Sequence, residues 1–134
     1  MPLIFLNGTG MAGEADHWIV GDSPMVAQTS TAPRYRFFAV GGAYPGLQDV
    51  GADPAAGGAS IVGEVYDVSY EQLREVLLPA EPAGLELGAI ELADGTGSLA
   101  MIVRQDYAEP ATRHDISAIG SWRAYRNSGE ETTE

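Results

Sequence analysis

The chain consists largely of short runs of apolar residues, some continuous and some alternating with polar residues. Such runs predict β-strands rather than long helices. The first run, Leu3–Leu6, is wholly apolar, as in a buried strand. Tyr35–Val40 carries the aromatic and β-branched residues that strands favour. Weaker runs of the same kind follow at Val26–Thr31 and Ser60–Tyr66. Strands are therefore expected to outnumber helices.

A β-hairpin is predicted in the second half of the chain. Apolar and polar residues alternate over most of Leu85–Leu92, Asp94 and Gly95 form a two-residue hairpin turn signal, and Ser98–Arg104 supplies the return strand. Earlier in the chain, Gly41–Gly58 is rich in Gly, Pro, Ala and Asp, and this composition predicts a long loop.

One convincing helix is predicted, over Tyr70–Leu78, with Ser69 as its N-cap and Pro79 ending it. Glu14–Val20 has room for one or two helical turns before Gly and Pro residues interrupt it. A short helix opening at Asp115 or Ser117 is expected to carry the apolar residues Ile116, Ile119, Trp122 and Tyr125.

The length of 134 residues suits one domain with a real hydrophobic core. We place that domain at residues 1–126 and interpret residues 127–134 as a disordered acidic tail. The chain has no internal repeat, and its single strong helix among consecutive strands does not follow alternating β/α order.

The charge and the residue types that are missing exclude several classes of function. Nineteen acidic residues against seven basic ones give a net charge of −12, which disfavours nucleic acid and membrane lipid as partners. The chain has no Lys and no Cys, so Walker phosphate loops, lysine and thiolate catalysis and cysteine zinc sites are excluded. With only two His, no metal or other cofactor is expected. The apolar start is too short for a signal peptide and no later segment spans a bilayer, so the cytoplasm is the expected location.

The pattern G-x-G-x-x-G at residues 8–13 follows the first strand, as in a dinucleotide-binding fingerprint. That interpretation also needs a following helix, a parallel strand and an acidic residue about 20 positions later. The segment after Gly13 is interrupted by Gly21 and Pro24, and the next strand-like segment has no acid at its end. The remaining interpretations are a tight structural turn or a loop, Asn7–Gly10, whose N–H groups cradle a carboxylate or carbonyl oxygen.

Three further residues are candidates for ligand binding. His17, just past the glycine loop, is either a donor or base for a small anionic ligand or a polar residue on a surface turn. Arg34 and Arg36 flank Tyr35 on a strand, and one of them either reaches a ligand carboxylate or forms a surface salt bridge. We include Tyr35 and Arg36 among the candidate binding residues.

Several segments together resemble the gamma-glutamylcyclotransferase-like superfamily, and more closely the C-terminal domain of allophanate hydrolase and its stand-alone relatives. The first resemblance rests on the strand-end glycine loop, the extended strand at Tyr35, the turn Tyr44–Leu47 and the segment Gly63–Tyr66 before a helix. The closer one is carried by Thr31–Arg36, Leu87–Gly95 and Asp115–Tyr125.

The resemblance implies an α+β fold: a small mixed β-barrel of about six strands with one main helix and short flanking helices. It also implies a cavity floored by Asn7, Gly8, Thr9 and Gly10, with Glu81 as the catalytic acid/base after the main helix. The sequence departs from the family where Asn7 replaces the usual aromatic residue, Gly10 replaces a leucine, and Glu81 lies between two prolines.

Three functions stay open at this point. The first is binding of a small amide or carboxylate ligand, with acyl-transfer or cyclisation chemistry at Glu81. The second is a non-catalytic accessory or assembly domain, partnered by an amidohydrolase or by a second copy of the chain. The third is decarboxylation of a carbamate-type substrate, with His17 and Tyr35 more involved than Glu81.

Overall fold

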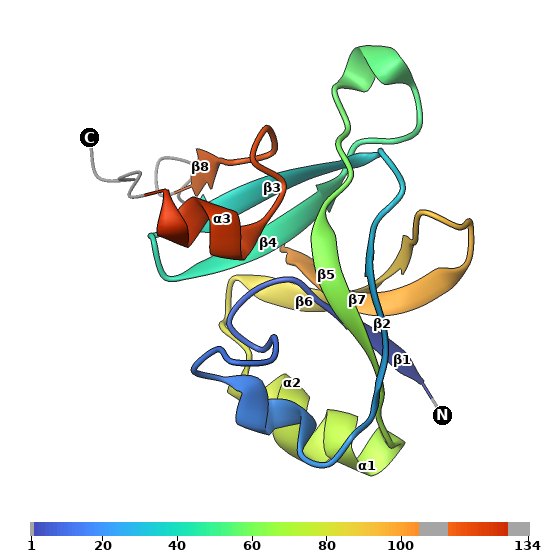
Figure 1. Cartoon of the computed structure of the whole chain (residues 1–134), viewed down its shortest axis with the longest axis vertical. Helices are drawn as coiled ribbons and strands as arrows, with labels where there is room; N and C mark the ends of the chain where they lie inside the picture. The colour runs from blue at the N-terminus through green and yellow to red at the C-terminus, as the bar shows by residue number, and fades with distance from the viewer. Residues whose placement is uncertain (1, 105–112, 129–134) are drawn as a thin grey trace.

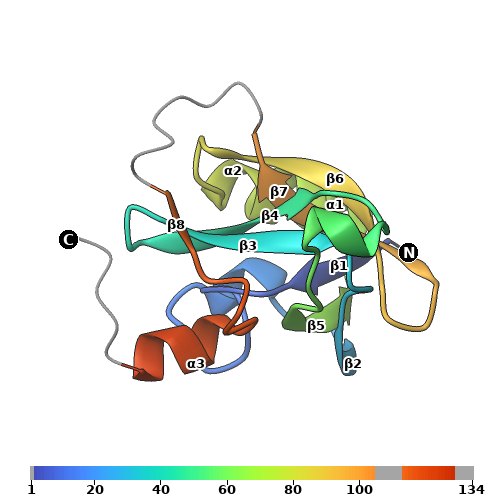
Figure 2. The same ribbon diagram turned by 90° about the horizontal axis from the view of Figure 1, so that it is seen from above.

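The computed structural model describes residues 2–104 and 113–128, within which eight strands form one curled, mixed sheet shaped like a half-barrel (Figures 1 and 2). The predicted α+β fold is confirmed, with eight strands in place of about six. The strands are β1 (Leu3–Leu6), β2 (Met25–Ser30), β3 (Tyr35–Val40), β4 (Tyr44–Asp49), β5 (Val62–Asp67), β6 (Leu85–Glu91), β7 (Gly97–Val103) and β8 (Arg113–Asp115).

Helical segments are short, and three of them join into the one main helix. They are η1 (His17–Val20), η2 (Pro54–Ala56), α1 (Tyr70–Gln72), η3 (Leu73–Leu77), α2 (Leu78–Ala80) and α3 (Trp122–Asn127). Segments α1, η3 and α2 follow one another without a gap, and Ser69 caps their start by accepting the N–H of Gln72 at 2.9 Å.

Pro79 does not end the main helix, contrary to the sequence prediction, but lies inside α2. A proline has no N–H and its ring crowds the carbonyl four residues earlier, so a regular α-helix is disturbed there. The preceding segment Leu73–Leu77 is a π-helix, and the N–H of Leu78 reaches back five residues to the carbonyl of Leu73. This wider turn lets the helix continue past the proline and places Glu81 directly after it.

Two other local predictions are wrong. Gly41–Gly58 is not one long loop, because it contains β4 and η2. The C-terminal helix begins at Trp122, not near Asp115, because Ser121 supplies the N-cap and accepts the N–H of Ala124 at 3.2 Å.

The central strand β7 brings distant parts of the chain together. The strand order is β2-β5-β1-β7-β4-β3-β8, and β6 also pairs with β7 in antiparallel register. Strands β1 and β4 both run parallel to β7, with Phe5 opposite Ala100 and Leu47 opposite Ile102. Since β1 and β4 share one edge of β7, the end of β1 and the start of β4 come close to each other.

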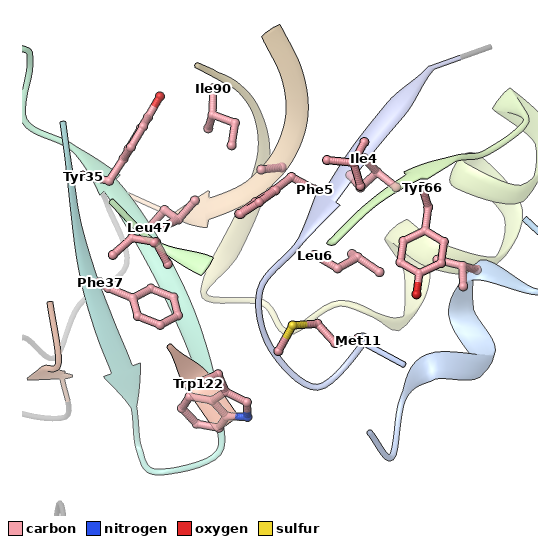
Figure 3. Packing of buried hydrophobic residues seen from close by; sticks show 14 of the residues in the cluster. Ile4, Phe5, Leu6, Met11, Tyr35, Phe37, Leu47, Tyr66, Ile90 and Trp122 are labelled. Carbon is pink, nitrogen blue, oxygen red and sulfur yellow. The ribbon is translucent and has the colours of Figure 1, made fainter. Parts of the chain in front are cut away.

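The hydrophobic core lies inside the curl of the sheet (Figure 3). Phe5, Phe37 and Leu47 point into it from β1, β3 and β4, and Trp122 closes it from α3. All four side chains are at most 1% exposed, and burial of each contributes about 1.5–3 kcal/mol or more to folding. Helix α3 is thereby fixed to the sheet far from α1 and α2 (Figure 1).

Part of the predicted acidic tail, residues 129–134, lies outside the described residues, while Asn127 is the last residue of α3. Within residues 2–104 and 113–128, no helix is both long and apolar enough to cross a membrane.

Candidate functional site

A cavity of about 270 Å³ lies where β1 ends and β4 begins. Its volume is slightly below the range of about 300–1,000 Å³ in which most small-molecule sites fall, so it suits a small ligand. Five parts of the chain form its wall: residues 5–10, the pair Asp16 and Ile19, residues 43–45, the group Ala80, Glu81, Pro82 and Leu85, and Met101 on β7. The cavity therefore brings the glycine loop, Asn7–Gly10, to the same space as Glu81.

The glycine loop presents backbone donors to this cavity. Strand β1 stops pairing with β5 at Leu6, so the next residues leave the sheet. Two carbonyls of the loop are used internally, since Gly8 accepts the N–H of Met11 at 3.1 Å and Thr9 accepts that of Asp16 at 2.9 Å. The N–H groups of Gly8, Thr9 and Gly10 have no acceptor among the described residues. Free donors at a cavity wall are suited to an oxyanion or a carbonyl oxygen.

Asn7 adds a side-chain donor beside these N–H groups. Its side chain is only 9% exposed, and its Nδ2 atom has no hydrogen-bond partner within the part of the chain that the structure describes. A buried amide left without a partner costs roughly 1–3 kcal/mol, which a hydrogen bond to a ligand would offset.

Gly8 is required by the close approach of Pro45, near the start of β4. A Cβ atom at Gly8 would lie 2.5 Å from Cδ and Cγ of Pro45, closer than atoms can pack. A glycine here lets the loop and Pro45 form one continuous wall of the cavity.

Glu81 lines the same cavity as the glycine loop and lies at the end of the main helix. Its backbone is extended, with φ −78° and ψ 148°, so the chain leaves the helix at this residue. Burial, together with a smaller effect of the negative charge of Asp16, raises the pKa of the Glu81 carboxyl to about 7. At neutral pH this carboxyl is divided between its two forms, as a general acid/base needs to be.

The charge at the cavity is negative. Among the described residues, Asp16 and Glu81 are the acidic residues that line it, and none of the seven Arg does so. Five Arg side chains form ion pairs elsewhere, and the other two stack on the rings of Phe38 and Trp122. A carboxylate in this cavity would therefore be held by N–H groups and not by a guanidinium.

The other three predicted binding residues lie outside this cavity. His17 braces the glycine loop from behind, with Nδ1 2.9 Å from the carbonyl oxygen of Gly10. The buried Tyr35 hydroxyl accepts the N–H of Glu91 at 2.8 Å. Arg36 pairs with Asp115 at 2.6 Å, which is the salt-bridge alternative foreseen for this strand. The structure thus joins Glu81 with Asn7–Gly10 and separates them from Tyr35 and Arg36.

Sequence reasoning missed several residues of the cavity wall. Asp16 was hidden in an irregular segment, although it is an acid close to the glycine loop. Tyr44 and Pro45 carry a turn signal that gave no indication of contact with the glycine loop. Met101 belongs to the predicted hairpin, but the parallel pairing of its strand with β1 and β4 was not predicted. Among the described residues, no group of three or more His, Asp or Glu is arranged to hold a metal ion.

Comparison with known proteins identifies relatives for nearly the whole chain. The family model of the allophanate hydrolase C-terminal domain matches residues 2–127. A protein of Vibrio cholerae serotype O1 named "Putative gamma-glutamylcyclotransferase" is 31% identical over 121 residues, which are 90% of this chain and 94% of that protein.

Solved structures share the fold. The protein c4763 of uropathogenic E. coli superposes with a TM-score of 0.83 at 27% identity, over 96% of this chain and 98% of that one. The urea amidolyase of K. lactis contains the same fold, with a TM-score of 0.85 at 21% identity, over 97% of this chain and 8% of that one. The predicted gamma-glutamylcyclotransferase-like fold is confirmed.

Proposed function

Because the chain belongs to the allophanate hydrolase C-terminal domain family, within the gamma-glutamylcyclotransferase-like fold, we propose that it cyclises a small gamma-glutamyl amide in the cavity between Asn7–Gly10 and Glu81. One observation carries the proposal: a carboxyl with a pKa of about 7 lines the same small cavity as three backbone N–H groups that have no acceptor among the described residues. Acyl transfer from an amide needs both of these groups.

In the proposed reaction, the ionised Glu81 carboxylate accepts a proton from the α-ammonium group of the substrate. The free amine then attacks the γ-carbonyl carbon, and a C–N bond forms to close a five-membered ring. Negative charge develops on the former carbonyl oxygen, where the N–H groups of Gly8–Gly10 stabilise it. Glu81 returns its proton to the amide nitrogen, the carbonyl re-forms and the original C–N bond breaks. Glu81 then takes the second proton from the ring nitrogen and passes it to the released amine, which leaves as an ammonium ion with 5-oxoproline as the other product.

The negative charge of Asp16 and Glu81 supports a substrate that brings an ammonium group into the cavity. The side-chain N–H groups of Asn7 and the loop donors are the groups available to a carbonyl or carboxylate oxygen. The cavity thus favours a ligand with a small cationic amine beside an amide.

The direct experiment incubates the purified protein with gamma-glutamyl amino acids and measures 5-oxoproline. Glu81→Gln keeps the size of the side chain and removes the proton acceptor, so turnover should fall roughly 10²–10⁴-fold. Glu71→Gln, an exposed carboxylate on the same helix, is the matched control and should retain full activity. Absence of 5-oxoproline from the unchanged protein with every substrate tested would reject the cyclotransferase.

Family membership also supports a second function, as an accessory domain of an amidohydrolase. The K. lactis urea amidolyase carries this fold as a small part of a long chain. The test mixes the protein with an allophanate hydrolase that lacks its C-terminal domain. Complex formation would support the assembly role, and release of ammonia and carbon dioxide would report decarboxylation of a carbamate.

A further inference from the structure

Glu64 is a buried charged residue behind the glycine loop, on the side away from the proposed reaction. Its side chain projects from β5 and the residue is 3% exposed. Its Oε1 atom accepts two hydrogen bonds, from the N–H of Ala12 at 2.8 Å and from the hydroxyl of Tyr66 at 2.9 Å. Burial and these contacts with Glu64 raise the pKa of Tyr66 to about 12, so the phenol stays a donor.

Arg123 brings α3 to the same segment of chain. Its guanidinium donates to the carbonyl of Ala12, to the carboxylate of Glu14 at 3.1 Å, and to Oε2 of Glu64 at 3.5 Å. The guanidinium of Arg123 thus bonds the backbone of Ala12 and the side chain of Glu14, which follow the glycine loop, and it also pairs with the buried carboxylate of Glu64. Figure 2 shows α3 lying beside this part of the chain.

Ala12 is therefore held at both of its backbone groups, its N–H by Glu64 and its carbonyl by Arg123. The turn bonds from Met11 to Gly8 and from Asp16 to Thr9 connect this anchor to the glycine loop within a few residues. Movement at Ala12 would be transmitted directly to the N–H groups at the cavity.

We propose that Arg123 and Glu64 are positioning residues, which hold the glycine loop from behind and so set the direction of its donors toward the ligand. The consequence for catalysis rests on the proposed function, whereas the effect on loop geometry does not. Neither residue lines the main cavity, so both act through the loop.

A smaller cavity of about 120 Å³ provides access to the anchor. Glu64 and Arg123 line it together with Gln28 and Ser121. Removal of the Arg123 side chain would enlarge this space beside the Glu64 carboxylate, so a free guanidinium ion could enter and replace the lost group.

The first experiment measures hydrogen exchange of backbone amides by NMR in the ligand-free protein. Arg123→Ala should speed exchange roughly tenfold or more at Ala12 and Met11, whose N–H groups bond to Glu64 and Gly8, while the amides of the central strands keep their protection. Low-millimolar guanidinium chloride should restore slow exchange, and sodium chloride at equal ionic strength should not. Arg126→Ala, an exposed residue on the same helix that stacks on Trp122, should leave the loop unchanged.

A second variant keeps the test valid if Arg123→Ala does not fold. Arg123→Lys preserves the charge but has a single nitrogen, which cannot reach Ala12, Glu14 and Glu64 together, so it should show the same faster exchange. Loop amides that remain fully protected in both folded variants, or faster exchange that guanidinium does not reverse, would overturn the proposal.

Turnover of gamma-glutamyl substrates separates this inference from the proposed function. If the unchanged protein is active, Arg123→Ala should lower kcat roughly tenfold or more, and guanidinium should rescue it. If the unchanged protein makes no 5-oxoproline, the proposed function fails, while guanidinium-reversible loosening of Ala12 would still support the anchor. Activity that is unaffected in Arg123→Ala would contradict a positioning role.

Discussion

Asp16 and Glu81 line the same cavity, and the charge of Asp16 adds to the burial that raises the pKa of Glu81 to about 7. Burial is the larger cause, because it removes water from an ionised carboxylate. The two acids come from different parts of the chain, one after the glycine loop and one after the main helix. The protonation of Glu81 should therefore depend both on pH and on the charge at position 16.

The stability of the protein should fall as pH rises from about 4.5 to about 7. In this window the folded protein holds a proton on Glu81 that the unfolded chain, with an ordinary glutamate pKa, has already lost. Glu81→Gln removes the cost of burying the charge. The variant should therefore be more stable than the unchanged protein by about 1–3 kcal/mol at pH 8, with this gain absent at pH 4.

Urea denaturation at the two pH values measures this difference. The exposed Glu71→Gln serves as the control and should show no such pH-dependent gain. An equal effect of Glu81→Gln at pH 4 and pH 8 would mean that the carboxyl is not buried as the structure shows.

Asp16→Asn should lower the pKa of Glu81 without returning it to the ordinary value of 4.5, since burial remains. A ¹³C NMR titration of the Glu81 side chain follows the change directly. If the protein is an active cyclotransferase, the acidic limb of its pH–rate profile should move to lower pH by the same amount. The exposed Asp22→Asn, which does not line the cavity, should leave the titration where it was.

Much of the fold could be predicted from local patterns. Tyr35–Val40 has the predicted bounds, and the hairpin around Asp94 and Gly95 is present as β6 and β7. Strand β4 was missed because Pro45 and Gly46 give no strand signal. Gly46 is needed there for packing, since a Cβ atom would lie 2.4 Å from Cγ2 of Val103 on β7. Such a requirement comes from a neighbour distant in sequence.

The candidate site could be predicted only in part, because it too depends on contacts between segments that are distant in the sequence. Glu81 and the glycine loop were paired through a family resemblance, and the structure brings them to one cavity. Arg123 and Glu64 lie in segments that carry the family resemblance, but no local signal predicts their contact with the chain after Gly10. That contact depends on three segments, β5, α3 and the chain after Gly10, which meet only in the folded protein.

Gly8→Ala should weaken ligand binding at the cavity. The added methyl group would lie 2.5 Å from the Pro45 ring, so the loop or the start of β4 has to move, at a cost of about 1–3 kcal/mol. A shift of this kind displaces the N–H donors, and affinity for 5-oxoproline or a gamma-glutamyl amide, measured by calorimetry, should fall roughly tenfold or more. In Gly97→Ala the nearest atom is at an ordinary 3.7 Å, so affinity should be retained. Unchanged affinity in Gly8→Ala would show that the loop does not contact the ligand.

Ser69→Ala should destabilise the main helix without altering Glu81 itself. The Ser69 hydroxyl accepts the N–H of Gln72, and its loss leaves that donor without its cap at a cost of about 1 kcal/mol. The helix buries Leu73 and Leu77 in the core, so the loss should appear in the global free energy of unfolding. Ser69→Asp keeps an oxygen acceptor at the N-cap and should retain most of the stability. Equal losses in both variants, measured by urea denaturation at one pH, would mean that the serine acts through packing and not as a cap.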